Sequence, residues 1–199
     1  MMMRSLLLAL SLSAALAIPA SAQTLPPGMK MHRIQAGEAD ASGWILAEST
    51  EGGFSVRLPL KFNDFTMETD AKEPTLRIFV VGAKSQEGIK FTATRIVYRK
   101  GAESAKHFFS QFERGLGLGT KPERITPRKI GERPAVDFVL KRASDVAYQR
   151  ALRLESDLLL MVVESPHSHD ATAQQFVTPF FDSVVVSARF SALCTVTAL

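Results

Sequence analysis

Cysteine is almost absent from this 199-residue sequence, which holds only one, Cys194, near its C-terminus. A single thiol forms no disulfide within a chain, so the folded state has to take its stability from a packed core rather than from cross-links. Cys194 can pair two chains or remain a free thiol, and the sequence leaves both alternatives open.

Long apolar runs are also missing. The longest, at 6–18, has 13 residues, whereas a transmembrane helix needs about 20. Arg4 precedes this run, and Pro19 and the small residues Ala20-Ser21-Ala22 follow it. This order predicts a cleavable signal peptide at 1–22, cut after Ala22. We therefore expect a periplasmic or secreted protein without a transmembrane segment after cleavage; an uncleaved anchor is the alternative.

Motifs of catalysis and cofactor binding are lacking as well. The sequence has no Gly-x-Ser-x-Gly elbow, and the glycines of 115–119 follow a helical pattern instead of joining a strand to a helix, as a dinucleotide fingerprint requires. We therefore expect no cofactor and no enzyme activity, although a catalytic triad assembled from distant residues leaves no such motif.

The chain divides by composition into four parts. After the signal peptide, the Pro- and Gly-containing residues 23–42 are typical of a flexible tether, with room for an edge strand at 30–35. Residues 43–187 hold all other periodic segments and predict a single domain, and 188–199 form a tail. Strands are predicted at 44–46, 54–58, 62–69, 76–81, 91–99, 133–142, 146–154, 158–163 and 183–187.

Two helices are predicted between these strands. Ala105, Phe108, Phe109, Phe112 and Leu116 form one apolar stripe with helical spacing. A second helix should begin at Asp170 as its N-cap and be kinked or split by Pro179. The run 158–163 is apolar on both sides, as in a strand covered on both faces. These patterns predict an α+β fold in which helices flank an antiparallel sheet, as an α/β/α sandwich.

Three segments resemble a known fold group. They are Glu51-Gly52-Gly53-Phe54-Ser55-Val56-Arg57-Leu58-Pro59, the strand run 135–163, and Phe180-Phe181-Asp182-Ser183-Val184. Together they resemble the PsbP-like group, which includes lumenal subunits of photosystem II, a Ran-binding nuclear transport factor and small bacterial envelope proteins. The resemblance implies an antiparallel sheet flanked by helices, usually without catalysis, and it carries over no set of functional residues.

Positive charge is concentrated in 121–153. This segment holds nine basic and four acidic residues, a net charge of +5, whereas the whole sequence has a net charge of +4. Its candidate partner-binding residues are Arg124, Arg128, Lys129 and Arg133. Because Phe138 and Tyr148 are its only aromatic residues, nucleic acid is not the expected partner. The expected partner is an anionic envelope surface or protein. The alternative is that these residues form an ordinary solvated face.

Two smaller features remain. His167, His169 and Asp170 are metal-ligand types at close spacing, but no fourth ligand is apparent, and a polar loop is the alternative. Asp137 lies mid-strand among apolar neighbours, so a cation such as Arg95, Arg150 or Arg153 should pair with it. His32 is expected to be exposed near the tether.

The sequence thus favours a non-catalytic periplasmic accessory or binding domain that meets an anionic envelope partner through its sheet edge and segment 121–153. A metal-assisted hydrolase built around His167, His169 and Asp170 is the alternative.

The predicted export can be tested on the native protein. We expect mass spectrometry of envelope material to find a mature N-terminus at Gln23, because the peptidase cuts after the small residue Ala22. A cytosolic product that still begins at Met1 contradicts the prediction.

Overall fold

A computed structural model describes residues 25, 27–34, 37–68, 76–98, 102–115 and 120–187. The predicted signal peptide, Leu116, Gly117 and Gly119, and the tail 188–199 with Cys194 lie outside the described residues.

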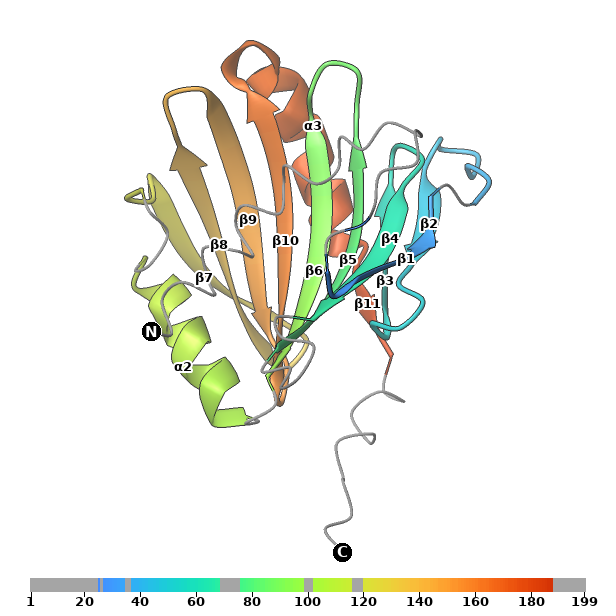
Figure 1. Cartoon of the computed structure of the whole chain (residues 1–199). Helices are drawn as coiled ribbons and strands as arrows, with labels where there is room; N and C mark the ends of the chain where they lie inside the picture. Colours follow the sequence, from blue (N-terminus) through green and yellow to red (C-terminus); the bar gives the residue numbers. More distant parts are fainter. Residues whose placement is uncertain are drawn as a thin grey trace, which may run out of the picture.

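Eight antiparallel strands form a large sheet, in the order β1-β4-β5-β6-β10-β9-β8-β7 (Figure 1). These strands are β1 (Met29–Arg33), β4 (Asn63–Glu68), β5 (Leu76–Lys84), β6 (Lys90–Tyr98), β7 (Arg124–Ile130), β8 (Arg133–Lys141), β9 (Asp145–Arg153) and β10 (Asp157–Pro166). The edge strand that the sequence allowed at 30–35 is present as β1. The sequence did not predict β7, the opposite edge strand.

Three further strands form a separate small sheet, in the order β11-β3-β2. They are β2 (Ile45–Glu48), β3 (Phe54–Leu58) and β11 (Val185–Val186). The sequence predicted a strand at each place but assigned all of them to one sheet. Alternation shows which side chains are buried and leaves open the sheet to which a strand belongs.

The middle of the large sheet is covered on both faces, as the apolar run 158–163 predicted. This run lies in β10, between β6 and β9. Leu158, Leu160 and Val162 belong to the core on one face, and Leu159, Met161 and Val163 to the core on the other.

The helix α2 (Ala102–Glu113) lies on one face, against β6, β9 and β10 (Figure 1). Its stripe of Ala105, Phe108, Phe109 and Phe112 is buried there, as predicted. Phe112 stacks on Phe138 with ring centroids 5.7 Å apart. The helix stops where predicted, because Gly115 takes a φ of 65° and its N–H donates to the carbonyl of Phe112.

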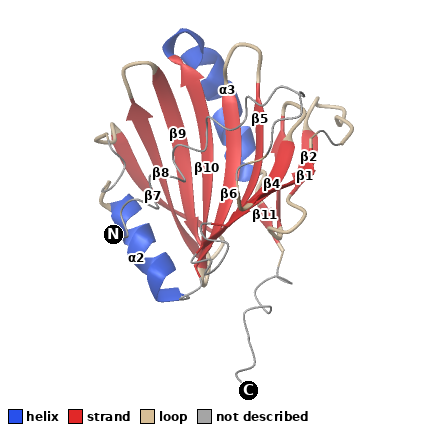
Figure 2. Cartoon of the chain, in the orientation of Figure 1, coloured by secondary structure: helices blue, strands red, loops and turns tan. Residues whose placement is uncertain are grey.

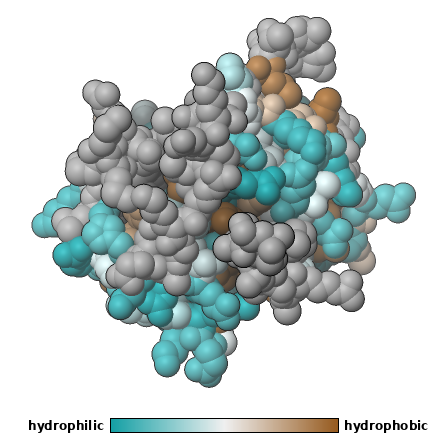
Figure 3. Space-filling view, turned by 60° about the horizontal axis from the view of Figure 1, so that its bottom comes forward, coloured by the Kyte–Doolittle hydropathy of each residue, from teal (hydrophilic) through white to brown (hydrophobic). Residues whose placement is uncertain are grey.

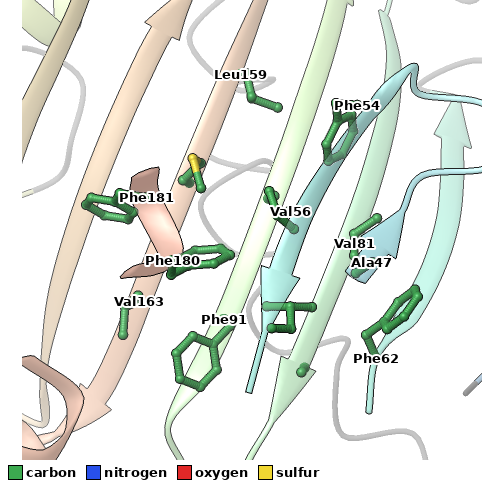
Figure 4. Packing of buried hydrophobic residues seen from close by; sticks show 14 of the residues in the cluster. Ala47, Phe54, Val56, Phe62, Val81, Phe91, Leu159, Val163, Phe180 and Phe181 are labelled. Carbon is green, nitrogen blue, oxygen red and sulfur yellow. The ribbon is translucent and has the colours of Figure 1, made fainter. Parts of the chain in front are cut away.

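The helix α3 (Asp170–Asp182) and the small sheet share the other face. Phe180 of α3 meets Phe91 of β6 edge-on at 5.8 Å, and Val56 of β3 lies in the same cluster (Figure 4). Pro179 was predicted to kink or split this helix, and the split is wrong, since α3 continues through Pro179. A proline near the C-terminal end of a helix leaves few later turns to disturb.

The fold is therefore a sheet-rich α+β fold (Figure 2). The predicted antiparallel sheet is confirmed, but a simple α/β/α sandwich does not describe it, because strands β2, β3 and β11 take part in covering the α3 face.

A buried arginine joins the two sheets. Arg95 of β6 donates from Nε to Asp157 Oδ2 at 2.9 Å and from Nη1 to the carbonyl oxygen of Gly52 at 2.7 Å. The side chains of Arg95 and Asp157 are 7% and 4% exposed. Gly52 lies in the turn between β2 and β3, where an added Cβ would come within 2.8 Å of Phe79 Cβ. The turn can therefore dock only with glycine at this position.

A second buried carboxylate holds the same turn. Asp64 of β4 is fully buried and accepts hydrogen bonds from the backbone N–H and the hydroxyl of Thr50, at 2.8 and 2.6 Å. Nearby, the side chain of His32 on β1 is 6% exposed and lies 2.8 Å from Thr66 Oγ1. The expected exposure of His32 is therefore wrong, because pairing of β1 with β4 buries its imidazole.

We expect Arg95→Met to lower the free energy of unfolding by about 3–5 kcal/mol, because it leaves the Asp157 charge buried without its partner. Urea denaturation of the purified protein measures this loss. Arg77→Met is the matched control: Arg77 is half-exposed and pairs with Glu51 and Glu68, so it should cost at most about 1 kcal/mol. Equal losses in the two variants would refute the role given to Arg95.

Candidate partner-binding surface

The edge strand β7 carries three of the four candidate partner-binding residues. It pairs with β8, which carries the fourth, Arg133. Pro127 lies in the middle of β7 and has no N–H to offer an added strand. Proline and charged side chains on an edge discourage backbone pairing with other chains, so contacts here are left to the side chains.

The four candidates do not share one environment. Arg124, Lys129 and Arg133 are exposed, and no described carboxylate lies within 4 Å of their charged groups. Arg128 differs, since its Nε lies 2.6 Å from Asp137 Oδ2. The strand register places Arg128 opposite Ala135, on the face of α3, and Lys129 on the face of α2. The basic residues thus follow one edge but point to both faces.

Asp137 pairs with Arg150, one of its three predicted candidate cations, and also with Arg128. Arg150 on β9 donates to both of its oxygens, at 2.7 and 3.0 Å, and to Asp182 of α3 at 2.8 Å. The guanidinium of Arg150 also lies 5.0 Å from the ring centre of Phe181. Burial alone would lower the pKa of Arg150, but the hydrogen bonds with Asp137 and Asp182 outweigh it and raise the pKa. This group is a structural clamp between β8, β9 and α3.

The nine basic residues of segment 121–153 therefore fall into two sets. Arg128, Lys141, Arg142 and Arg150 each have a carboxylate partner. The other five have none among the residues that the structure describes; we call them the unpaired cations, and they are Lys121, Arg124, Lys129, Arg133 and Arg153. The unpaired cations thus gather around β7 and around the β7–β8 and β9–β10 turns, which lie at the lower end of the large sheet in Figure 1.

A cavity of about 590 Å³ opens at that lower end. Its walls are Lys106 of α2, residues 132–134 where the β7–β8 turn enters β8, and residues 153–155 where β9 ends in the β9–β10 turn. Its lining includes Arg133, which the sequence singled out, and Arg153, which the sequence counted among the basic residues of 121–153 and considered as a partner for Asp137. Nothing in the spacing of the sequence signals that these two turns meet beside α2.

The histidine cluster is part of the turn into α3. His167 Nε2 lies 2.8 Å from the carbonyl oxygen of Arg142, and His169 Nδ1 lies 2.9 Å from the hydroxyl of Ser168. The predicted cap is wrong: α3 begins at Asp170, but His169 is the N-cap residue. No group of three His, Cys, Asp or Glu side chains in the described part of the chain is arranged to hold a metal ion.

The carboxylate of Asp170 is engaged elsewhere. Its Oδ1 accepts a hydrogen bond from the hydroxyl of Tyr148 at 2.6 Å. Burial raises the pKa of Tyr148 to about 12, and the hydrogen bond and charge of Asp170 act in the same direction. Burial also raises the pKa of Tyr98, helped by the charge of Asp157.

Tyr98 and Tyr148 are the only tyrosines, so the folded protein should show no phenolate absorbance at pH 10. Because the folded pKa of Tyr148 exceeds the unfolded value of 10.0, its neutral phenol stabilises the fold below pH 10, and this contribution is lost as the pH rises toward about 12. In Tyr98→Phe protein, Asp170→Asn should lower the pKa of Tyr148. Ionisation near pH 10 with unchanged circular dichroism contradicts the assignment.

No helix in the described ranges is long and apolar enough to cross a membrane.

Known proteins were compared by sequence and by structure. No family model and no curated protein matches the sequence. The structure is similar to that of the cyanobacterial PsbP protein of Synechocystis sp. PCC 6803, with 9% identity over 76% of this chain and 96% of that chain and a TM-score of 0.45. It is also similar to that of LpqN, described as involved in cell envelope biogenesis of Mycobacterium tuberculosis, with 12% identity over 81% and 86% of the chains and a TM-score of 0.36. A PsbP protein is thus among the structures that this fold resembles, as the sequence predicted, and the likeness concerns the fold alone.

Proposed function

We propose that this chain is a non-catalytic accessory or binding domain outside the cytoplasm, and that it meets an anionic envelope partner through the edge strand β7 and the basic segment 121–153. One observation carries the proposal: the five unpaired cations, which have no carboxylate partner among the residues that the structure describes, gather around one edge and one end of the large sheet. The other four cations of the segment, Arg128 of β7 among them, are paired with acids.

The character of the edge supports contact through side chains. Pro127 and the charges of Arg124 and Lys129 oppose the addition of a strand to β7. Exposed cations attract an anionic surface over about 8 Å at physiological salt, and salt screens the attraction. Association through this edge should therefore weaken as the salt concentration rises.

The hydrolase alternative has no comparable support. The ring of His167 and the carboxylate of Asp170 already have hydrogen-bond partners within the described structure, on Arg142 and Tyr148. The preference against nucleic acid stays a prediction of the sequence.

The double variant R124E/K129E tests the proposal. We expect it to reduce the affinity of the purified protein for envelope fractions by at least about tenfold at low salt, since each basic residue near an anionic surface contributes about 1 kcal/mol. Cosedimentation at low and high salt measures the change.

The control is R33E/K84E, which changes the net charge equally. Arg33 and Lys84 are exposed and lie at the end of β1 and at the end of β5, away from β7 in the sheet order. This control should bind as the unmodified protein does. Equal loss in both variants would show a general charge effect and would remove the β7 edge from the proposal.

A further inference from the structure

Arg153 stands apart from the other sheltered cations. Five described lysines and arginines are buried or half-buried. Four of them, Lys90, Arg95, Arg142 and Arg150, each have a carboxylate partner. Arg153 has no carboxylate within 4 Å and no hydrogen bond among the described residues. None of its nitrogens is among the buried side-chain atoms that lack a partner, so the guanidinium faces solvent and its N–H donors are open to an acceptor from outside.

The guanidinium of Arg153 is held in place by an aromatic ring. Its Cζ lies 5.7 Å from the ring centre of Phe109, and Phe109 is itself 1% exposed in the core under α2. Stacking on a fixed ring limits the motion of the side chain while leaving its five N–H donors free. The planar fork is therefore positioned before any ligand arrives.

The cavity around Arg153 contains charges of both signs. Lys106 and Arg133 add two cations, and Glu132 and Glu155 add two carboxylates. None of these side chains forms an ion pair within the described structure. The lining thus has a net charge of +1, with apolar surface from Pro134 and Leu154. Figure 3 brings this end of the molecule forward and shows that much of its described surface is hydrophilic.

Size and charge together define a class of ligand. A volume of about 590 Å³ lies in the range of sites for small organic molecules and far exceeds the space of a simple inorganic anion. A net charge of +1 is matched by a singly charged oxyanion. A guanidinium binds the two oxygens of a carboxylate or a phosphodiester in parallel, whereas carboxylates such as Glu132 and Glu155 accept hydrogen bonds from hydroxyl or ammonium groups.

We propose that this cavity binds a small organic ligand through a singly charged oxyanion, a phosphodiester or a carboxylate, seated on Arg153 and flanked by Lys106 and Arg133. Hydroxyl or ammonium groups of the same ligand face Glu132 and Glu155. The inference goes beyond the function proposed above, because it concerns a compact ligand in a cavity and not a surface along β7.

The test uses soluble probes of stated chemistry. Glycerophosphoglycerol supplies a phosphodiester with hydroxyls, gluconate supplies a hydroxylated carboxylate, and glycerol is the uncharged control. Binding is followed by NMR of the arginine side-chain Nε–H signals and by calorimetry. We expect one charged probe to bind and to shift the Arg153 signal, and Arg153→Gln to weaken its binding about tenfold or more, as for a charge-assisted hydrogen bond.

Two further variants keep the test decisive. Lys106→Gln changes an exposed helix residue and should weaken the same probe severalfold, so it replaces Arg153→Gln if that protein does not fold. Arg33→Gln, on β1 at the opposite edge of the sheet and outside the cavity lining, should leave probe binding unchanged. Vesicles of phosphatidylglycerol and phosphatidylcholine distinguish the source: Arg153-dependent binding to them assigns the oxyanion to a lipid headgroup, and binding of soluble probes alone assigns it to a free metabolite.

The outcomes separate the two proposals. The proposal for the cavity is wrong if neither charged probe nor the vesicles bind. It is also wrong if binding to unmodified and to Arg153→Gln protein is equal. Either result leaves the R124E/K129E experiment unaffected. Conversely, if R124E/K129E protein binds the probe and also associates normally with envelope fractions, the proposal for the β7 surface is wrong and the proposal for the cavity stands.

Discussion

The buried contact of Arg95 with Asp157 and the Gly52 carbonyl is the constraint on which the rest of the structure depends. It lies between the two sheets, where a lone charge or a lone carbonyl would be strongly destabilising, so all three groups have to be present together. Asp64 performs the same task for Thr50 at the start of the turn. The turn between β2 and β3 is thereby fixed, and with it the small sheet that shares the α3 face of the large one.

With the turn in this place, the two edges of the large sheet are chemically different. Near β1, β4 and β5, cations meet carboxylates: Glu51 of the docked turn accepts from Lys30 and Arg77, and the hydrogen bond with Lys30 is the main reason that its pKa is lowered. Near β7, cations outnumber acids, and Asp137 takes Arg150 and Arg128 for the clamp to α3. The cations left over belong to no structural task that the described residues show, which is why a binding role is assigned to that end.

Much of the fold could be predicted because local patterns report burial. Strict alternation predicted β3, a doubly apolar run predicted β10, and one aromatic stripe predicted α2. The pattern failed at β7. Its sequence Arg-Ile-Thr-Pro-Arg-Lys-Ile does not alternate and has a proline at its centre, and both are tolerated because an edge strand needs little burial. It also failed to separate the small sheet, since that depends on the long-range hydrogen bonds that Arg95 donates to Gly52 and that Asp64 accepts from Thr50, which no local window contains.

The candidate site could be predicted only as far as charge composition allows. The sequence identified segment 121–153 by its charge and gave three candidate cations for Asp137, of which Arg150 is the one that pairs with it; Arg128, its second partner, was not among them. Counting could not tell that Arg128 is committed to Asp137 while Arg153, two strands away, is not. That distinction depends on Phe109, which holds Arg153 beside α2, where no described carboxylate lies within 4 Å of it. A charge is available for binding only where the fold supplies no internal partner for it, and that property belongs to the packing of distant segments rather than to the segment that carries the charge.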